Sequence, residues 1–183
     1  MYAISFSFFT LSFYVVMNTI YLVRHGIAEE ANILKPDSGR ELTSEGRTRV
    51  QRIGAKLAQM GIKPHLIVSS PYTRAIQTAD ILAAELGYTG ERMQDNRITP
   101  NGRYESFSAL FQEVKQHREI MFVTHDPCVS YLIGSVCGAA NFNVDYKKAA
   151  VTCIGIGRQS PPLGSLLWFA PPRLLLGDGS QHE

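Results

Sequence analysis

The chain has 183 residues, and 18 Lys and Arg against 16 Asp and Glu give it a formal net charge of +2. This length suits a single domain with a core large enough to fold without disulfides or metal ions. A charge so close to balance lacks the basic excess of a nucleic-acid-binding protein, and we expect no nucleic-acid partner.

The first charged residue is Arg24, and two interpretations of the uncharged residues 1–16 stay open. A secretory signal has a basic start and a small-x-small cleavage site, and this segment lacks both. A membrane-spanning helix needs ~20 mostly apolar residues, whereas Ser and Thr interrupt this run. The segment is either an extension upstream of a true start at Met17 or a genuine leader or anchor. We expect the domain at residues 17–176, a loose polar tail at 177–183, and no membrane association unless the extension is real.

Short apolar runs alternate with helix-period stretches from residue 18 onward. In chain order they predict a strand at 20–23, a helix from Thr43 to Gly61, a strand at 66–68, a helix from Pro71 to Gly87, a helix at 107–114, a strand at 120–123, a helix from Pro127 to Gly138, and two late strands at 151–156 and 166–169. Strands that alternate with helices indicate βαβ units. The pattern therefore predicts one α/β domain, a three-layer sandwich with a mainly parallel central sheet flanked by helices.

Cys128, Cys137 and Cys153 are odd in number and lie in apolar stretches without metal-ligand spacing. They are expected to be small core residues in a reducing compartment, which indicates a cytoplasmic protein. His, Asp and Glu do not fall at metal-ligand spacing either. We expect neither a metal nor another cofactor.

Three polar clusters follow the first three predicted strands. Arg24, His25 and Gly26 follow the first strand, Ser69-Ser70-Pro71 with Arg74 the second, and His125 the third. Ligands of open α/β sheets gather outside the carboxyl ends of the strands. Two arginines and two histidines are thus predicted to converge at one edge of the sheet.

These residue types suit phosphoryl transfer, in which charge spreads over the phosphoryl oxygens. Arginine offers a fixed fork of donors to such oxygens, and a neutral imidazole nitrogen can attack phosphorus while a backbone carbonyl holds the other ring nitrogen. Gly26 is expected to let the chain turn sharply without crowding the phosphate. A helix beginning at Gly26 or Pro71 would add amide donors. A Gly-rich loop with Lys-Ser/Thr is absent, which argues against a nucleotide-binding P-loop.

The same residues carry a family resemblance. Residues 22–26 (Leu-Val-Arg-His-Gly), 69–79 (Ser-Ser-Pro-x-x-Arg-Ala-x-Gln-Thr-Ala) and 124–127 (Thr-His-x-Pro) resemble the motifs of the histidine phosphatase superfamily, which includes phosphoglycerate mutases and acid phosphatases. The short length and residues 40–46, 98–102 and 168–172 are similar to the SixA-type phosphohistidine phosphatases. The resemblance implies a phosphoglycerate mutase-like fold.

The resemblance also implies a role for each site residue. His25 is the expected nucleophile, which becomes phosphorylated, and Arg24, Arg74 and His125 are expected to bind the phosphoryl oxygens. His125 is expected to be cationic in the transition state. Arg40 matches an arginine of the subgroup and is a further candidate contact, as is Gly26. The implied substrate is phosphohistidine on a protein, such as a phosphotransfer domain of a two-component system.

One catalytic role stays unfilled, because cleavage of a phosphate ester needs a general acid for its leaving alkoxide. Relatives that cleave esters carry an acidic residue where this chain has Asn101, so that Glu105 and Asp126 are the remaining candidates. An imidazole leaving group is readily protonated, and the missing acid therefore favours phosphohistidine. A small-molecule phosphomonoesterase and a non-catalytic phospho-ligand-binding module remain the alternatives.

Overall fold

A computed structural model of the protein describes residues 17–139, 142 and 144–177. The expectations for residues 1–16 and 178–183 lie outside the described residues. The helices are α1 (Ser44–Gln59), α2 (Thr73–Glu85), α3 (Tyr104–Val114), α4 (Cys128–Val136) and α5 (Pro172–Leu176), with short 3₁₀ turns η1 (Asp37–Gly39) and η2 (Asn96–Ile98). Within these described residues, no helix has the length and apolar character to cross a membrane.

The six strands form one mixed sheet in the order β3-β2-β4-β1-β5-β6. They are β1 (Asn18–Arg24), β2 (Leu66–Ser69), β3 (Arg92–Gln94), β4 (Glu119–Thr124), β5 (Val151–Gln159) and β6 (Pro162–Ala170). The pairs β3-β2, β2-β4 and β4-β1 are parallel, while β1-β5 and β5-β6 are antiparallel. The predicted three-layer α/β fold with a mainly parallel sheet is confirmed.

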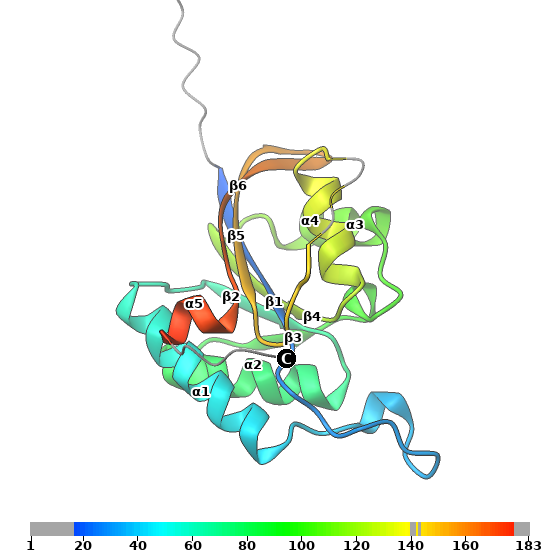
Figure 1. The fold of residues 1–183 in the computed structure, drawn as a ribbon. Helices are drawn as coiled ribbons and strands as arrows, with labels where there is room; N and C mark the ends of the chain where they lie inside the picture. The colour runs from blue at the N-terminus through cyan, green and yellow to red at the C-terminus, as the bar shows by residue number, and fades with distance from the viewer. Residues whose placement is uncertain (1–16, 140–141, 143, 178–183) are drawn as a thin grey trace, which may run out of the picture.

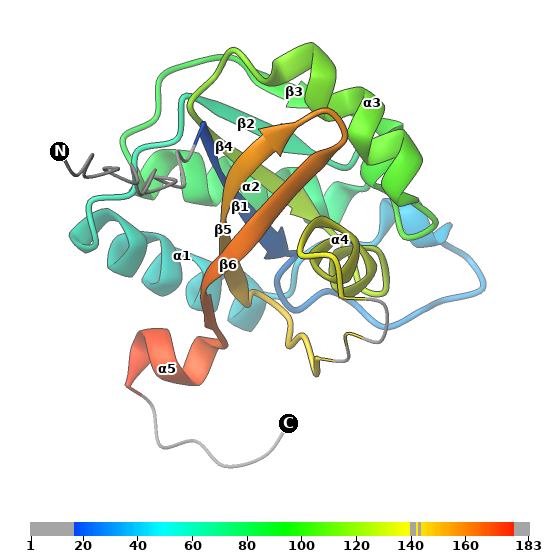
Figure 2. The same ribbon diagram turned by 90° about the horizontal axis from the view of Figure 1, so that it is seen from above.

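Helices cover both faces of this sheet, with α3 and α4 on one side and α1, α2 and α5 on the other (Figures 1 and 2). Successive strand residues point to opposite faces. Ile20 and Leu22 accordingly belong to the core under α3 and α4, whereas Tyr21 and Val23 belong to the core under α1 and α2. Both faces of the central strands are apolar because both are buried.

The helix limits agree with their sequence signals. The Thr43 side chain accepts a hydrogen bond from the Gly46 amide at the start of α1, and Gly61 follows the helix with a φ of 77°. Gly87 and Gly138 take positive φ after α2 and α4. These left-handed positions favour glycine because it has no Cβ.

Several features differ from the prediction. β3 and α5 were not predicted. β3 has only three residues, two of them exposed, and α5 has only five, so that neither shows a periodic apolar pattern. No helix begins at Gly26, since the chain runs as a loop with the turn η1 until α1 begins at Ser44. The helix expected after Pro71 begins at Thr73. Of the cysteines, two are buried and Cys137 is partly buried.

Candidate active site

The three polar clusters converge because β2, β4 and β1 are neighbours in the sheet. The parallel ladder continues past the strand ends. The His25 amide donates to the Thr124 carbonyl and the Ser70 amide to the Val123 carbonyl, each at 2.9 Å. These bonds fix the backbone of His25 and Ser70 at the carboxyl edge, as predicted.

His25 is buried, with 7% of its surface exposed. Its Nδ1 lies 2.7 Å from the Gly26 carbonyl oxygen, which can only accept, so that Nδ1 carries the proton and Nε2 the lone pair. Burial, against the opposing Gly26 bond and together with the cations Arg74, Arg24 and Arg40, lowers the pKa of His25 to about 3. His25 is therefore a neutral imidazole whose Nε2 carries the lone pair that a nucleophile needs.

Arg74 extends from the first turn of α2 and is 4% exposed. Its Nε donates to His25 Nε2 at 3.1 Å, while Nη1 donates to the Asp37 carbonyl oxygen at 2.6 Å and Nη2 to Asp37 Oδ2 at 3.0 Å. The guanidinium also lies 5.0 Å from the centre of the Tyr72 ring. Contacts with Asp37 and Tyr72, which belong to two different segments, thus hold Arg74 against His25 Nε2.

His125 is 1% exposed, and its ring centre lies 5.0 Å from that of His25. Its Nε2 lies 2.8 Å from Ser70 Oγ, which itself accepts from the Tyr72 amide at 3.3 Å. Since a hydroxyl can both donate and accept, the direction of this hydrogen bond follows from which ring nitrogen of His125 carries the proton. Burial, together with His25 and Arg74, lowers the pKa of His125 to about 2. The ring is therefore neutral in the empty site, and a cationic form would need the opposing charge of a bound phosphoryl group.

Arg24, the last residue of β1, donates through Nη1 to the Tyr146 carbonyl oxygen. Burial lowers its pKa, and the charges of Asp126 and Asp145 act in the opposite direction. Arg24 Nε and His125 Nδ1 are both buried without a hydrogen-bond partner. Arg24 Nε is a donor, and His125 Nδ1 becomes one when it carries a proton. Since buried polar atoms are rarely left unpaired, these two atoms fit a site built for an anion.

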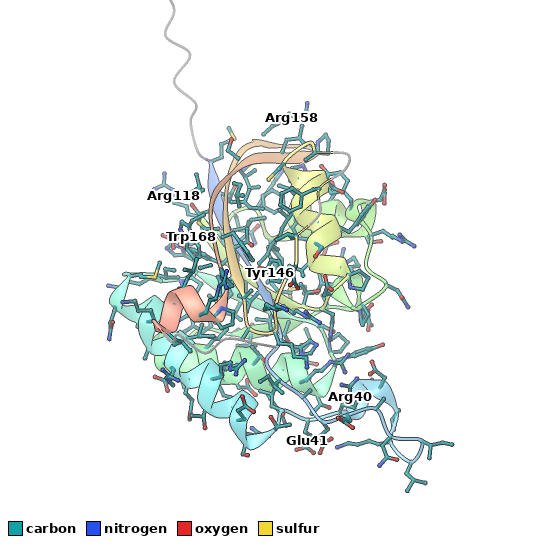
Figure 3. All side chains as sticks on the ribbon, in the orientation of Figure 1. Arg40, Glu41, Arg118, Tyr146, Arg158 and Trp168 are labelled. Carbon is teal, nitrogen blue, oxygen red and sulfur yellow. The ribbon has the colours of Figure 1, made fainter. Side chains whose placement is uncertain are left out.

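Arg40 lies on the loop after β1 (Figure 3). Its Nε donates to the Glu29 carbonyl oxygen and its Nη1 to Asp37 Oδ1, both at 2.7 Å. Its charge contributes to the lowered pKa of His25. Arg40 therefore joins the cluster electrostatically, and its contact with a substrate stays a prediction.

Gly26 is constrained by packing, which the sequence did not predict. A Cβ at this position would lie 2.7 Å from Val50 Cγ2, so that the glycine allows α1 to pack closely. Its amide donates to Thr78 Oγ1 at 3.1 Å, and its carbonyl orients His25. A direct contact between Gly26 and the phosphoryl group stays a prediction.

The two candidate acids differ in their surroundings. Asp126 follows His125 directly, is partly buried, accepts a 2.6 Å bond from Ser130 Oγ, and acts by its charge on Arg24. Glu105 is exposed in the first turn of α3, where a carboxylate is favoured, and acts by its charge on Tyr104. Of the two, Asp126 is the one placed beside the cluster.

Three residues of the site were not predicted from the sequence, namely Asp37, Tyr72 and Tyr146. Asp37 precedes Arg40 by three residues in a polar loop, a spacing that carries no signal without the fold. Tyr72 packs its ring edge against His125, with centres 4.9 Å apart. The Tyr146 hydroxyl donates to the Leu22 carbonyl oxygen at 2.6 Å and so fixes the segment that accepts from Arg24. Over the described ranges, no group of three or more His, Cys, Asp or Glu side chains could hold a metal ion.

Comparisons with known proteins agree with this geometry. The family model of the histidine phosphatase superfamily (branch 1) matches residues 20–107. An uncharacterised protein of Picosynechococcus sp. is 32% identical over 164 residues, which cover 86% of this chain and 98% of that protein. The mitochondrial serine/threonine-protein phosphatase Pgam5 of Drosophila ananassae is 36% identical over 40% of this chain and 25% of its own length. The structure of the protein histidine phosphatase SixA complexed with tungstate superposes with a TM-score of 0.76 and 22% identity, covering 84% of this chain and 97% of that one.

Proposed function

The chain belongs to the histidine phosphatase superfamily, and we propose that it is a phosphatase that removes phosphate from histidine on a protein. A phosphotransfer domain of a two-component system is the proposed kind of substrate, and the cytoplasm the proposed compartment. One observation carries the proposal: Nε2 of His25 is unprotonated and lies on Arg74 Nε, the His125 ring packs against that of His25, and Arg24 Nε and His125 Nδ1 are buried without a partner.

The proposed reaction has two steps. Nε2 of His25 attacks phosphorus as the bond from phosphorus to the substrate nitrogen breaks, and the leaving imidazole takes a proton from water. A water molecule then attacks the phosphorus on His25, which releases inorganic phosphate and restores the imidazole. Arg24, Arg74 and His125 supply donors to the phosphoryl oxygens in both steps.

The need of the leaving group for a proton donor distinguishes the hydrolysis of phosphohistidine from that of a phosphate ester. An imidazole nitrogen is readily protonated, so that the reaction does not depend on a strong general acid. Of the two candidate acids, Glu105 is exposed on α3, and Asp126 accepts a hydrogen bond from Ser130. SixA is described as a protein histidine phosphatase, and the superposition with it supports the same class of substrate here.

A protein substrate is also supported by the loop after β1. Ile33 and Leu34 lie at 101% and 89% exposure on the loop that carries Asp37 and Arg40. Large apolar side chains exposed beside a site are typical of protein–protein contacts. A small phosphorylated metabolite would gain little from them.

A phosphomonoesterase, acting on a small molecule or on a protein, is the second candidate. It is favoured by Asp126, the carboxylate nearest the cluster in sequence, and by the similarity to a serine/threonine-protein phosphatase. If Asp126→Asn and Glu105→Gln leave ester hydrolysis unchanged, neither residue is the acid of such a reaction.

The test compares phosphate release from phosphohistidine proteins and from a panel of phosphate esters, each with wild-type protein and His25→Ala. We expect the wild type to prefer phosphohistidine and the His25→Ala variant to lose turnover. Undiminished release by His25→Ala would contradict the proposed nucleophile. A wild type that binds phosphohistidine proteins without any release, even in a single turnover, would instead be a phospho-ligand-binding module.

A further inference from the structure

The Asp37 carboxylate bridges two arginines of the phosphoryl site. Oδ1 accepts from Arg40 Nη1 at 2.7 Å, and Oδ2 accepts from Arg74 Nη2 at 3.0 Å. The Asp37 backbone oxygen accepts from Arg74 Nη1 at 2.6 Å. Like a phosphoryl group, the carboxylate presents two anionic oxygens to two guanidinium groups.

This arrangement restrains the nucleophile. With Nη1 and Nη2 of Arg74 on Asp37, the remaining Nε donates to His25 Nε2. That bond occupies the lone pair with which His25 would attack phosphorus. Arg74 must therefore leave Nε2 before attack, and a phosphoryl oxygen is the acceptor that could draw it away.

The two partners differ in freedom to move. The Arg74 side chain is 5% exposed, while the Asp37 side chain is 51% exposed on the turn η1. Its place on α2 and its burial keep Arg74 at the site even when its guanidinium turns away from Nε2, whereas the Asp37 carboxylate is half exposed and is easily solvated when released. Displacement of the Asp37 carboxylate therefore costs less than displacement of Arg74.

We propose that Asp37 is a positioning residue whose carboxylate takes the place of the phosphoryl group between Arg40 and Arg74 in the empty enzyme and gives way when a phosphoryl dianion binds. The inference rests on the proposed function, because it concerns the same site. After hydrolysis the carboxylate returns to the arginines and competes with the product, inorganic phosphate. Asp37 thereby weakens product binding and speeds product release.

The test measures the dissociation constant of inorganic phosphate by titration calorimetry, which needs no turnover. Asp37→Asn keeps the size and one acceptor but removes the competing charge. We expect it to bind inorganic phosphate about tenfold more tightly than the wild type, the order of one like charge removed from a partly exposed site. In steady-state turnover, inhibition by phosphate becomes stronger and kcat falls together with KM.

Asp80→Asn is the matched control, because Asp80 is similarly exposed and pairs with Arg92 away from this cluster. It should leave phosphate affinity unchanged.

Asp37→Ser removes the same charge with a smaller side chain and should also tighten the binding of inorganic phosphate. This second variant keeps the test valid if Asp37→Asn does not fold. If the folded Asp37 variants bind phosphate as the wild type does, or more weakly, the proposal is wrong. A failure of the proposed phosphatase function itself would be seen separately, in the comparison of wild-type protein on phosphohistidine proteins and phosphate esters.

Discussion

The chemistry of the site depends on keeping His25 neutral. Burial and three neighbouring arginines oppose protonation of its ring, and the Gly26 carbonyl selects the tautomer. The same surroundings lower the pKa of His125. Both histidines are thus charged more readily in the unfolded chain than in the folded protein, which makes stability depend on pH.

The free energy of unfolding should fall as pH decreases from 6.5 to 5. In this range the unfolded chain binds protons at both histidines, whose ordinary pKa is about 6.5, whereas the folded pKa values are about 3 and about 2. Each histidine contributes a slope that approaches about 1.4 kcal/mol per pH unit. Urea unfolding at several pH values should give a shallower slope for His125→Asn than for the wild type, and equal slopes would contradict the neutral His125.

Arg74→Lys should lower kcat by about 100-fold or more, the usual cost of losing a donor to the transition state. A lysine has no planar fork and cannot reach His25 Nε2, the Asp37 carbonyl oxygen and Asp37 Oδ2 in the same geometry. Arg92→Lys, at the Asp80 ion pair, is the control and should leave kcat unchanged. A rate for Arg74→Lys within twofold of the wild type would show that charge alone suffices.

At the scale of elements, α1 and the loop after β1 hold the nucleophile in place. Gly46 lies in the first turn of α1, where an added Cβ would be 2.0 Å from the Ile27 carbonyl oxygen. Ile27 follows His25 and Gly26 directly, and its carbonyl accepts from the Thr43 amide at 3.0 Å. This close approach gives a physical reason for the glycine in the segment at residues 40–46.

Gly46→Ala should therefore reduce both stability and activity. The Cβ must push Ile27 away from α1, at a cost of about 1–3 kcal/mol in the free energy of unfolding, and the shift is transmitted to His25. At Gly39, by contrast, a Cβ would meet only ordinary contacts of 3.6 Å and more. Denaturant unfolding and kcat/KM should distinguish Gly46→Ala from a nearly neutral Gly39→Ala, and the same result for both would refute the packing argument.

The exposed tip of the same loop should matter only for protein substrates. The double substitution of Ile33 and Leu34 by Ser is expected to raise KM for a phosphohistidine protein by about tenfold, as for a truncated apolar contact worth 1–2 kcal/mol. It should leave the hydrolysis of a small phosphoramidate unchanged. Leu174→Ser, on α5 at the opposite side of the molecule (Figures 1 and 2), is the control. An equal effect on both substrates would show that the loop tip does not contact the protein substrate.

At the scale of the whole molecule, the sheet order brings Arg24 and His125, which lie 101 positions apart in the sequence, to the same edge. This convergence could be predicted, because parallel strands place their carboxyl ends on one edge. β1, β2 and β4 could also be predicted from their apolar runs, and the four longer helices from apolar residues at helical spacing. A terminal glycine marks the end of α1, α2 and α4.

Other features could not be predicted for physical reasons. β3 is an edge strand with two exposed side chains, so that its pairing with β2 leaves no apolar pattern. Asp37 and Tyr146 reach the site through a loop conformation that no local preference encodes. The packing constraint on Gly26 could not be predicted because its neighbour, Val50, comes from a helix 24 residues later.

The central claim is that phosphate passes from a histidine of a substrate protein to Nε2 of His25. The most direct measurement mixes excess enzyme with a phosphohistidine protein, stops the reaction in alkali within milliseconds to seconds, and locates the phosphoryl group by mass spectrometry of peptides. We expect a transient phosphoryl group on His25 that decays as inorganic phosphate appears, and none on His25→Asn. Phosphate released at the wild-type rate with no phosphoryl group ever found on His25 would contradict the account.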